Sequence, residues 1–232
     1  MENVSKYCYD NGVLKNKFDI LDQNTLQKIE RGITTYRISQ LRCIKNFIHD
    51  FSRVDSYLKI HKYLFGDIYS FAGEIRDEAI YKSNEPYYQG KTPFCYPSFI
   101  YEQLSSYLNK MFVNLRGVTS REDMVRCISY YYGEINMVHP FREGNGRTLR
   151  IFMELLVEEV NHYLSIPDME IHYSNWDIHD RDELLKATIY SSITGDNTEI
   201  EKCYDKVLVY SDEKKKSRWF LFYFYFSVRI YI

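Results

Sequence analysis

Apolar residues recur with helical spacing along most of the chain. From Asn24 to Asn46 they fall at every third to fifth position, the pattern of an amphipathic helix, and a second helix fits Asp55 to Phe65. The same pattern returns in five later segments, at 97–111, 120–135, 147–164, 180–193 and 198–209. It predicts a chain that is mainly α-helical.

One stretch after Gly73 breaks this helical pattern. Residues Glu74 to Tyr81 fit a short strand, Asn84 to Lys91 form a polar, turn-rich loop, and Thr92 to Tyr96 fit a returning strand. Ser120, followed by an acidic residue three positions later, resembles a capping box and starts the helix after it. We therefore expect a helical bundle with one β-hairpin.

Composition favours a single packed domain. The chain has 232 residues, of which 45% are hydrophobic and 27% charged, which is typical of a globular protein. No linker interrupts the helical segments, so we assign one domain to residues 1–210, with a core at about 55–195. A formal net charge of -2 gives no reason to expect nucleic acid or an anionic membrane as the main partner. Any anion site must therefore be local.

The cysteines and the first residues indicate a reducing compartment. Five cysteines are scattered without a Cys-x-x-Cys pair, and the acidic and basic residues that follow Met1 do not resemble a secretory signal. We expect a cytoplasmic protein, and export as an effector stays open.

The last segment, 211–232, is first charged and then rich in aromatic and β-branched residues. Its apolar part, Trp219 to Ile232, is shorter than the roughly 20 residues of a helical membrane span and is interrupted by Arg229. Three interpretations stay open: a poorly packed end, a strand or helix docked on the body, and a peripheral membrane contact.

The loop between two predicted helices carries the candidate chemistry. Gly144, Asn145 and Gly146 stand just before a helix, so their backbone N–H groups could turn toward a common anion. Two glycines in a helix-joining loop can equally serve a turn that needs positive φ. The side chains around the glycines decide between these interpretations.

Arg147 and Arg150 share one face of the first helical turn. A helix N-terminus carries about half a positive charge and disfavours cations, so two arginines there indicate a multiply charged anion such as a polyphosphate. The alternative is that both solvate an exposed helix face. Glu143 could bind Mg²⁺ that bridges phosphate oxygens, and His139 could take a proton from a hydroxyl, although each alone is more often solvated or structural.

The sequence His-Pro-Phe-Arg-Glu-Gly-Asn-Gly-Arg-Thr-Leu-Arg at 139–150 resembles the Fic motif at every defined position, His-Pro-Phe-x-(Asp/Glu)-Gly-Asn-Gly-Arg-x-x-Arg. Residues 61–76 are similar to the segment that leads into the target-binding flap of that family. The resemblance covers roughly residues 10 to 205 and implies a Fic-type helical bundle with one β-hairpin flap.

The resemblance also implies a protein adenylyltransferase that moves AMP from ATP to a Tyr, Thr or Ser hydroxyl. His139 would be the general base and Glu143 the Mg²⁺ ligand. Nucleotide phosphates would bind at five residues of the motif: Gly144, Asn145, Gly146, Arg147 and Arg150. The hairpin from about Ile75 to Phe94 would hold the target segment by strand addition.

Two features depart from the family pattern. The loop Asn84 to Lys91 is long and rich in tyrosine, and we find no Ser/Thr-x-x-x-Glu-Gly/Asn inhibitory helix; Ser192 to Asn197 comes nearest. We therefore expect a toxin-like enzyme that a separate antitoxin restrains, of the kind linked to cell filamentation. Two alternatives stay open: transfer from another nucleotide or of phosphocholine, and an idle Fic fold that only binds.

Overall fold

The computed structural model describes residues 5–173 and 178–211. The aromatic and charged segment 212–232, for which three interpretations were open, lies outside these ranges. Within them the chain forms seven α-helices: α1 (Gln23–Leu41), α2 (Val54–Phe65), α3 (Ile100–Leu115), α4 (Arg121–Val138), α5 (Asn145–Val160), α6 (Ile178–Thr194) and α7 (Thr198–Val207). Two short 3₁₀ helices, η1 (Pro97–Phe99) and η2 (Asn161–Tyr163), precede α3 and follow α5. The prediction of a mainly α-helical fold is confirmed.

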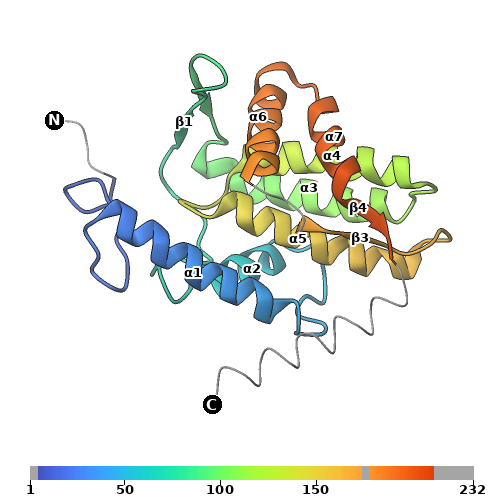
Figure 1. Cartoon of the computed structure of the whole chain (residues 1–232), viewed down its shortest axis with the longest axis horizontal. Helices are drawn as coiled ribbons and strands as arrows, with labels where there is room; N and C mark the ends of the chain where they lie inside the picture. Colours follow the sequence, from blue (N-terminus) through green and yellow to red (C-terminus); the bar gives the residue numbers. More distant parts are fainter. Residues whose placement is uncertain (1–4, 174–177, 212–232) are drawn as a thin grey trace.

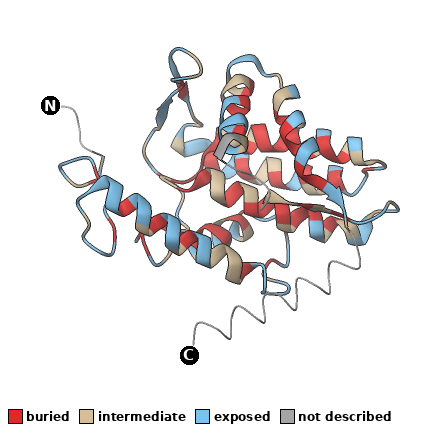
Figure 2. Cartoon of the chain, in the orientation of Figure 1, coloured by how far each residue is buried: buried red, intermediate tan, exposed pale blue. Residues whose placement is uncertain are grey.

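Helix α5 runs through the middle of the bundle, with α1 and α2 on one side and α4, α6 and α7 on the other (Figure 1). The buried residues concentrate on α4 and α5, whereas α1 has a broad exposed face (Figure 2). Phe152 and Leu156 of α5 and Ile128 of α4 are fully buried in this core. The two helices that flank the candidate loop are thus both packed in the core.

Side chains cap two of the helices, at Ser120 as the sequence suggested and at Asp22, where no cap was predicted. The Ser120 hydroxyl accepts a hydrogen bond from the Asp123 N–H at 3.0 Å, which starts α4, and the Asp22 carboxylate does the same for Thr25 at 2.9 Å in α1. Helix α5 begins at Asn145, two residues before the predicted start, because Gly144 adopts a left-handed conformation and directly precedes its first turn.

The hairpin exists, but its strands are shorter than predicted. Strand β1 (Tyr81–Ser83) pairs antiparallel with β2 (Lys91–Pro93), and Lys82 lies opposite Thr92. Residues 74–80, predicted as strand, are irregular. The reason is that their polar groups bond elsewhere: the Arg76 N–H donates to the Pro140 carbonyl at 2.8 Å, and the Glu78 carboxylate accepts from the Lys6 N–H at 2.9 Å.

A second antiparallel pair was not predicted. Strand β3 (Met169–Ile171) pairs with β4 (Leu208–Tyr210), which directly follows α7. Each strand has three residues, too few for a period of two to stand out, and the helical pattern at 198–209 runs through Leu208 and Val209. None of the helices in the described ranges is long and apolar enough to cross a membrane.

Candidate active site

The candidate loop reverses the chain between α4 and α5 with two left-handed residues. His139 ends α4 with φ of 47°, and Gly144 precedes α5 with φ of 83°. Between them the Phe141 side chain is fully buried. The loop is therefore fixed at both ends and in the middle, and its polar groups face the start of α5.

His139 is held as a neutral base. Its Nδ1 donates to the Asn136 carbonyl at 3.1 Å, and its Nε2 is buried without a hydrogen-bond partner in the described part of the chain. The ring stacks on Phe94 of the hairpin at 3.8 Å between centroids. Burial, with the positive charge of Lys82, holds the pKa of His139 well below its usual value. At neutral pH Nε2 thus offers a free lone pair.

The start of α5 offers several backbone donors. The Gly144 N–H donates to the Glu143 carboxylate at 2.8 Å, and the first N–H that is bonded to a helix carbonyl is that of Thr148, to Gly144 at 3.0 Å. The N–H groups of residues 145–147 have no carbonyl within the helix to bond. These groups, at the positive end of the helix dipole, are suited to bind an anion, and we refer to them as the cradle.

The Asn145 side chain closes the loop and does not face the cradle. Its Oδ1 accepts from the Phe141 N–H at 2.9 Å and its Nδ2 donates to the Phe141 carbonyl at 2.7 Å. Only the backbone of Asn145 is therefore left to contact an anion.

His61 of α2 supports the loop from below. Its Nδ1 accepts from the Gly73 N–H at 2.7 Å, so Nε2 carries the proton and donates to the Glu143 carbonyl at 2.9 Å. The ring stacks on Phe141 at 3.7 Å between centroids. Burial lowers the pKa of His61 to about 4, which keeps it neutral. The segment 61–76 thus contacts the motif directly, because His61 bonds both Gly73 and the Glu143 carbonyl.

Arg147 has partners that sequence reasoning missed. Its guanidinium forms an ion pair with Glu30 of α1 at 2.5 Å and lies 4.7 Å from the centroid of the Phe65 ring. Glu30 is buried and also accepts from the Tyr69 hydroxyl. The helical pattern placed Glu30 in α1 but gave no sign of its partner, which is 117 residues away.

Arg150 differs from Arg147. No carboxylate in the described ranges pairs with Arg150, and its guanidinium lies against the buried Tyr132 hydroxyl, where it partly offsets the rise in the pKa of Tyr132 that burial causes. The two arginines, which looked equivalent in the sequence, thus differ in the structure: Arg147 pairs with Glu30, and Arg150 has no acidic partner among the described residues.

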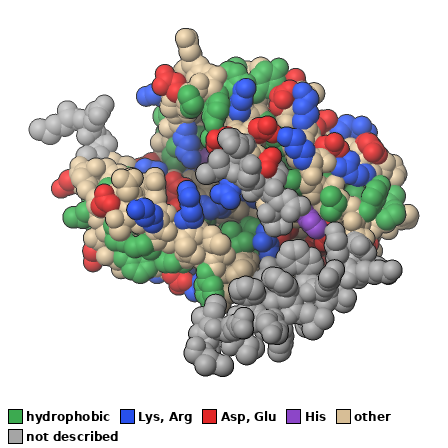
Figure 3. Space-filling view, in the orientation of Figure 1, with side chains coloured by type: hydrophobic (Ala, Val, Ile, Leu, Met, Phe, Trp, Pro, Cys, Tyr) green, Lys and Arg blue, Asp and Glu red, His purple; other side chains and the backbone are tan. Residues whose placement is uncertain are grey.

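Both arginines line a cavity of about 510 Å³ between α1 and the start of α5. Its charged lining comprises five arginines and two glutamates: Arg31, Arg42, Arg147, Arg150, Arg181, Glu30 and Glu143. Lys and Arg side chains gather around a hollow beside α1 in the space-filling view (Figure 3). An excess of guanidinium groups suits an anionic occupant.

Glu143 stands where the cavity meets the cradle. Burial by itself would raise its pKa, but Lys82, the Gly144 N–H and Arg147 together lower it, so Glu143 is a carboxylate at neutral pH. Its Oε1 accepts from Gly144, while no hydrogen bond to Oε2 is found among the described residues. This oxygen fits a hard cation that completes its coordination with phosphate and water. The described residues contain no cluster of three or more metal-binding side chains.

The segment Ser192 to Asn197, which comes nearest to an inhibitory motif, includes the end of α6 and connects it to α7. Gly195, with φ of 76°, follows the end of α6, and the Asp196 carboxylate accepts from the Thr198 N–H at 2.9 Å at the start of α7. Asp196 thus bonds the first residue of α7 and forms no ion pair with Arg150.

Residues 51–157 match the model of the Fic/DOC family. The chain is 31% identical over 170 residues to the probable protein adenylyltransferase y4lH of Sinorhizobium fredii, covering 70% of this chain and 80% of y4lH. It is 35% identical over 182 residues to the protein adenylyltransferase VbhT of Bartonella schoenbuchensis. That match covers 78% of this chain but only 34% of VbhT. The chain belongs to the Fic/DOC family.

Solved structures show the same fold. The BepC protein of Bartonella tribocorum, solved with bound AMPPNP, superposes with a TM-score of 0.74 at 20% identity, covering 89% of this chain and 97% of BepC. The prediction of a Fic-type helical bundle is thus confirmed.

Replacing Gly144 with alanine should destroy the cradle. A Cβ there would stand 2.4 Å from the Phe65 ring, in addition to the strain of a left-handed alanine. Gly12→Ala is the matched control, because Gly12 has the same φ of 83° and a Cβ added there would meet no atom within 4 Å. We expect Gly12→Ala to cost about 1 kcal/mol of stability and Gly144→Ala about 1–3 kcal/mol more, measured by urea unfolding. Equal losses would show that the Phe65 contact is unimportant.

The buried neutral His61 should make the fold sensitive to acid. The pKa of His61 is lowered on folding, so the unfolded chain takes up its proton first as pH falls below about 6.5. The contribution of His61 to the free energy of unfolding is therefore present above that pH and is lost as the pH falls toward the folded pKa of about 4. We expect His61 to account for a loss of about 2 kcal/mol between pH 7.5 and 5, and His61→Asn to lack this part of the loss. A pH slope unchanged in the variant would contradict the assignment.

Proposed function

We propose that this chain is a protein adenylyltransferase that moves AMP from ATP onto a Tyr, Thr or Ser hydroxyl of a target protein. The observation that carries the proposal is the free lone pair of His139 Nε2, placed in one tight loop with an anion cradle and Arg150. The names of the relatives y4lH and VbhT support the same activity. An enzyme that has lost its activity would have no physical reason to keep this set of groups.

The base and the cradle divide the reaction between them. His139 Nε2 takes the proton of the target hydroxyl while that oxygen attacks the α-phosphorus. The bond from the α-phosphorus to the bridging oxygen breaks, and pyrophosphate leaves with the bonding electrons. The backbone N–H groups of residues 145–147 hold the α- and β-phosphates, so charge is stabilised where it develops.

The two arginines contribute in different ways. Arg150 is free to grip the terminal phosphate, whereas Arg147, held by Glu30, presents a fixed guanidinium beside the β-phosphate. Mg²⁺ bound to Glu143 would neutralise phosphate charge and orient the leaving group. Glu143 is ionised and has an uncommitted oxygen for this task.

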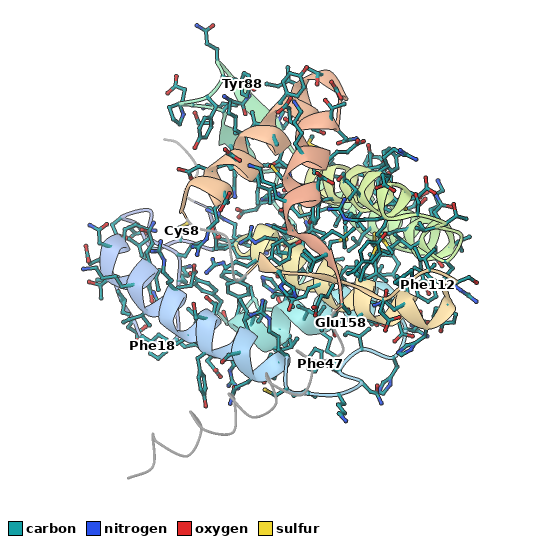
Figure 4. All side chains as sticks on the ribbon, turned by 45° about the vertical axis from the view of Figure 1, so that its right-hand side comes forward. Cys8, Phe18, Phe47, Tyr88, Phe112 and Glu158 are labelled. Atoms are coloured by element: carbon teal, nitrogen blue, oxygen red, sulfur yellow. The ribbon has the colours of Figure 1, made fainter. Side chains whose placement is uncertain are left out.

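The hairpin is the candidate target site. All three residues of β1 are exposed, whereas Thr92 in the middle of β2 is buried. An extended segment can add to the outer edge of β1 through backbone hydrogen bonds. The hairpin tip contacts α6: the ring centroids of Tyr88 at the tip and Tyr190 of α6 lie 6.4 Å apart (Figure 4). A target strand added here would bring its hydroxyl toward His139.

The function can be tested with α-labelled ATP, UTP, CTP and GTP in cell lysate, followed by mass spectrometry of labelled proteins. We expect AMP on a hydroxyl side chain, and a loss of about 10²- to 10⁴-fold in His139→Ala with ATP affinity nearly intact, since a base acts on the target's proton. Labelling from another nucleotide alone would change the donor, and normal labelling by His139→Ala would remove His139 from its role.

Exchanging Glu143 for Gln should raise the Mg²⁺ requirement, because a neutral amide is a poorer ligand for a hard cation. A metal titration of the transfer rate measures this, and ATP binding without metal serves as the control. A variant that turns over as fast at the same Mg²⁺ concentration would show that the carboxylate is not a metal ligand.

The isolated chain should be active without an activating mutation, because no acidic residue in the described ranges pairs with Arg150. A separate inhibitor that supplies a Glu to Arg150 would then be its natural restraint. Expression of the chain alone should slow growth more than expression of His139→Ala. A purified protein that is inactive until Asp196 is changed to Gly would contradict this and point to inhibition within the chain.

A further inference from the structure

Arg76 is a buried guanidinium that bonds only to backbone carbonyls. It is 1% exposed, and none of the ion pairs in the described ranges involves it. One long hydrogen bond of 3.5 Å goes to the Val138 carbonyl, and three short ones go to other carbonyls: Nε donates to His139 at 2.8 Å, and the terminal nitrogens donate to Glu78 and Cys95, each at 2.6 Å. Burial lowers the pKa of Arg76, but an arginine stays charged in a protein.

These three carbonyls belong to three parts of the candidate site. His139 is the candidate base, Glu78 lies on the segment that enters the hairpin, and Cys95 lies on the segment that leaves it. The Arg76 backbone adds a fourth link, since its N–H donates to the Pro140 carbonyl at 2.8 Å. One side chain therefore joins both ends of the hairpin to the residue that ends α4.

Further contacts reinforce the same junction. The Cys95 N–H donates to the Met137 carbonyl at 3.0 Å, and the Phe94 ring stacks on His139. His139 is left-handed, a conformation that persists in a non-glycine residue only where its surroundings hold it. Arg76 bonds the carbonyl of that residue directly.

A buried charge without a carboxylate is a costly way to stabilise a fold, and a packed apolar side chain would serve better. The planar fork of an arginine, however, fixes several acceptors in one plane at set distances, which no apolar side chain can do. The free energy spent on burying this charge is understandable if the reaction depends on the relative position of His139 and the two ends of the hairpin.

We propose that Arg76 is a positioning residue that fixes the hairpin relative to His139. This rests on the proposed function, because the hairpin would carry the target hydroxyl and His139 would take its proton. Arg76 would contact neither the target hydroxyl nor the proton that it loses, but its bonds to backbone carbonyls set the distance between the hairpin and His139. Loss of the fork should therefore affect target use and turnover more than nucleotide binding, since the cradle is held separately by His61 and Asn145.

The test compares Arg76→Lys with Arg121→Lys. Lysine keeps the charge but has one nitrogen, which cannot span three carbonyls. Arg121 is the control: it also donates to carbonyls, those of Leu208 at 2.9 Å and Asp205 at 2.5 Å, and it lies at the opposite end of α4 from His139. Unlike Arg76 it also pairs with a carboxylate, that of Asp205 at 2.6 Å, so the two variants are compared at equal loss of Tm. Each variant is measured for Tm, ATP Kd, target KM, kcat and amide exchange.

For Arg76→Lys we expect kcat to fall on the order of 10²-fold, target KM to rise and ATP Kd to stay within about twofold. Exchange at the amides of Phe94 and Cys95, which bond Ile80 and Met137, should quicken about tenfold or more. Arg121→Lys should lower Tm and leave kcat and these amides unchanged.

The proposal is overturned if Arg76→Lys keeps the wild-type kcat and the slow exchange of these amides. It is also overturned if ATP affinity falls as much as kcat, or if Arg76→Lys and Arg121→Lys have the same kcat and exchange rates when their Tm values are equal. Arg76→Gln is the second variant, and failure of both to fold even in the cold would assign Arg76 to stability alone. If the wild-type chain transfers no AMP, the proposed function fails, and the exchange data still decide whether Arg76 fixes the hairpin to His139.

Discussion

The reversal of the chain between His139 and Gly144 is the constraint on which the rest of the site depends. Two left-handed residues must be held five positions apart while α4 and α5 stay packed in the core. Phe141 anchors the middle of the loop and Asn145 closes it with two hydrogen bonds to Phe141. The neighbours of the loop then follow: His61 stacks under it, and only glycine fits at 144 against Phe65.

The same reversal sets the electrostatics of the site. It aims the positive end of α5 at the space beside His139, so an anion there meets backbone N–H groups and two arginines. Glu30 neutralises part of this charge by pairing with Arg147, whose side chain is 24% exposed, while Glu30 is 11% exposed. Such a pair fixes geometry more surely than it adds stability. Beside the Fic motif, the positive groups left for a ligand are Arg150 and the N-terminal end of α5.

The sequence predicted what local patterns can encode. Helical periodicity located the helices, the Ser120 cap started α4 as expected, and the motif located every candidate site residue in one loop and the first turns of α5. Pairing between distant segments leaves no periodic signal, so Glu30, Tyr69 and Arg76 were missed as partners of that loop. The predicted strand was wrong over residues 74–80 for the same reason: these residues look extended, but Arg76 bonds the loop and Glu78 bonds the N-terminal segment.

If the site transfers AMP as proposed, the α-phosphate of ATP and its adenosine reach the target protein together. Parallel reactions with ATP labelled at the α-phosphate, at the γ-phosphate or in the adenine ring distinguish this transfer from others. We expect the α and adenine labels to reach protein in equal amounts, the γ label to remain off the protein, and His139→Ala to lose both protein labels. Protein labelled from the γ-phosphate, or from the α-phosphate without adenine, would rule out adenylyl transfer.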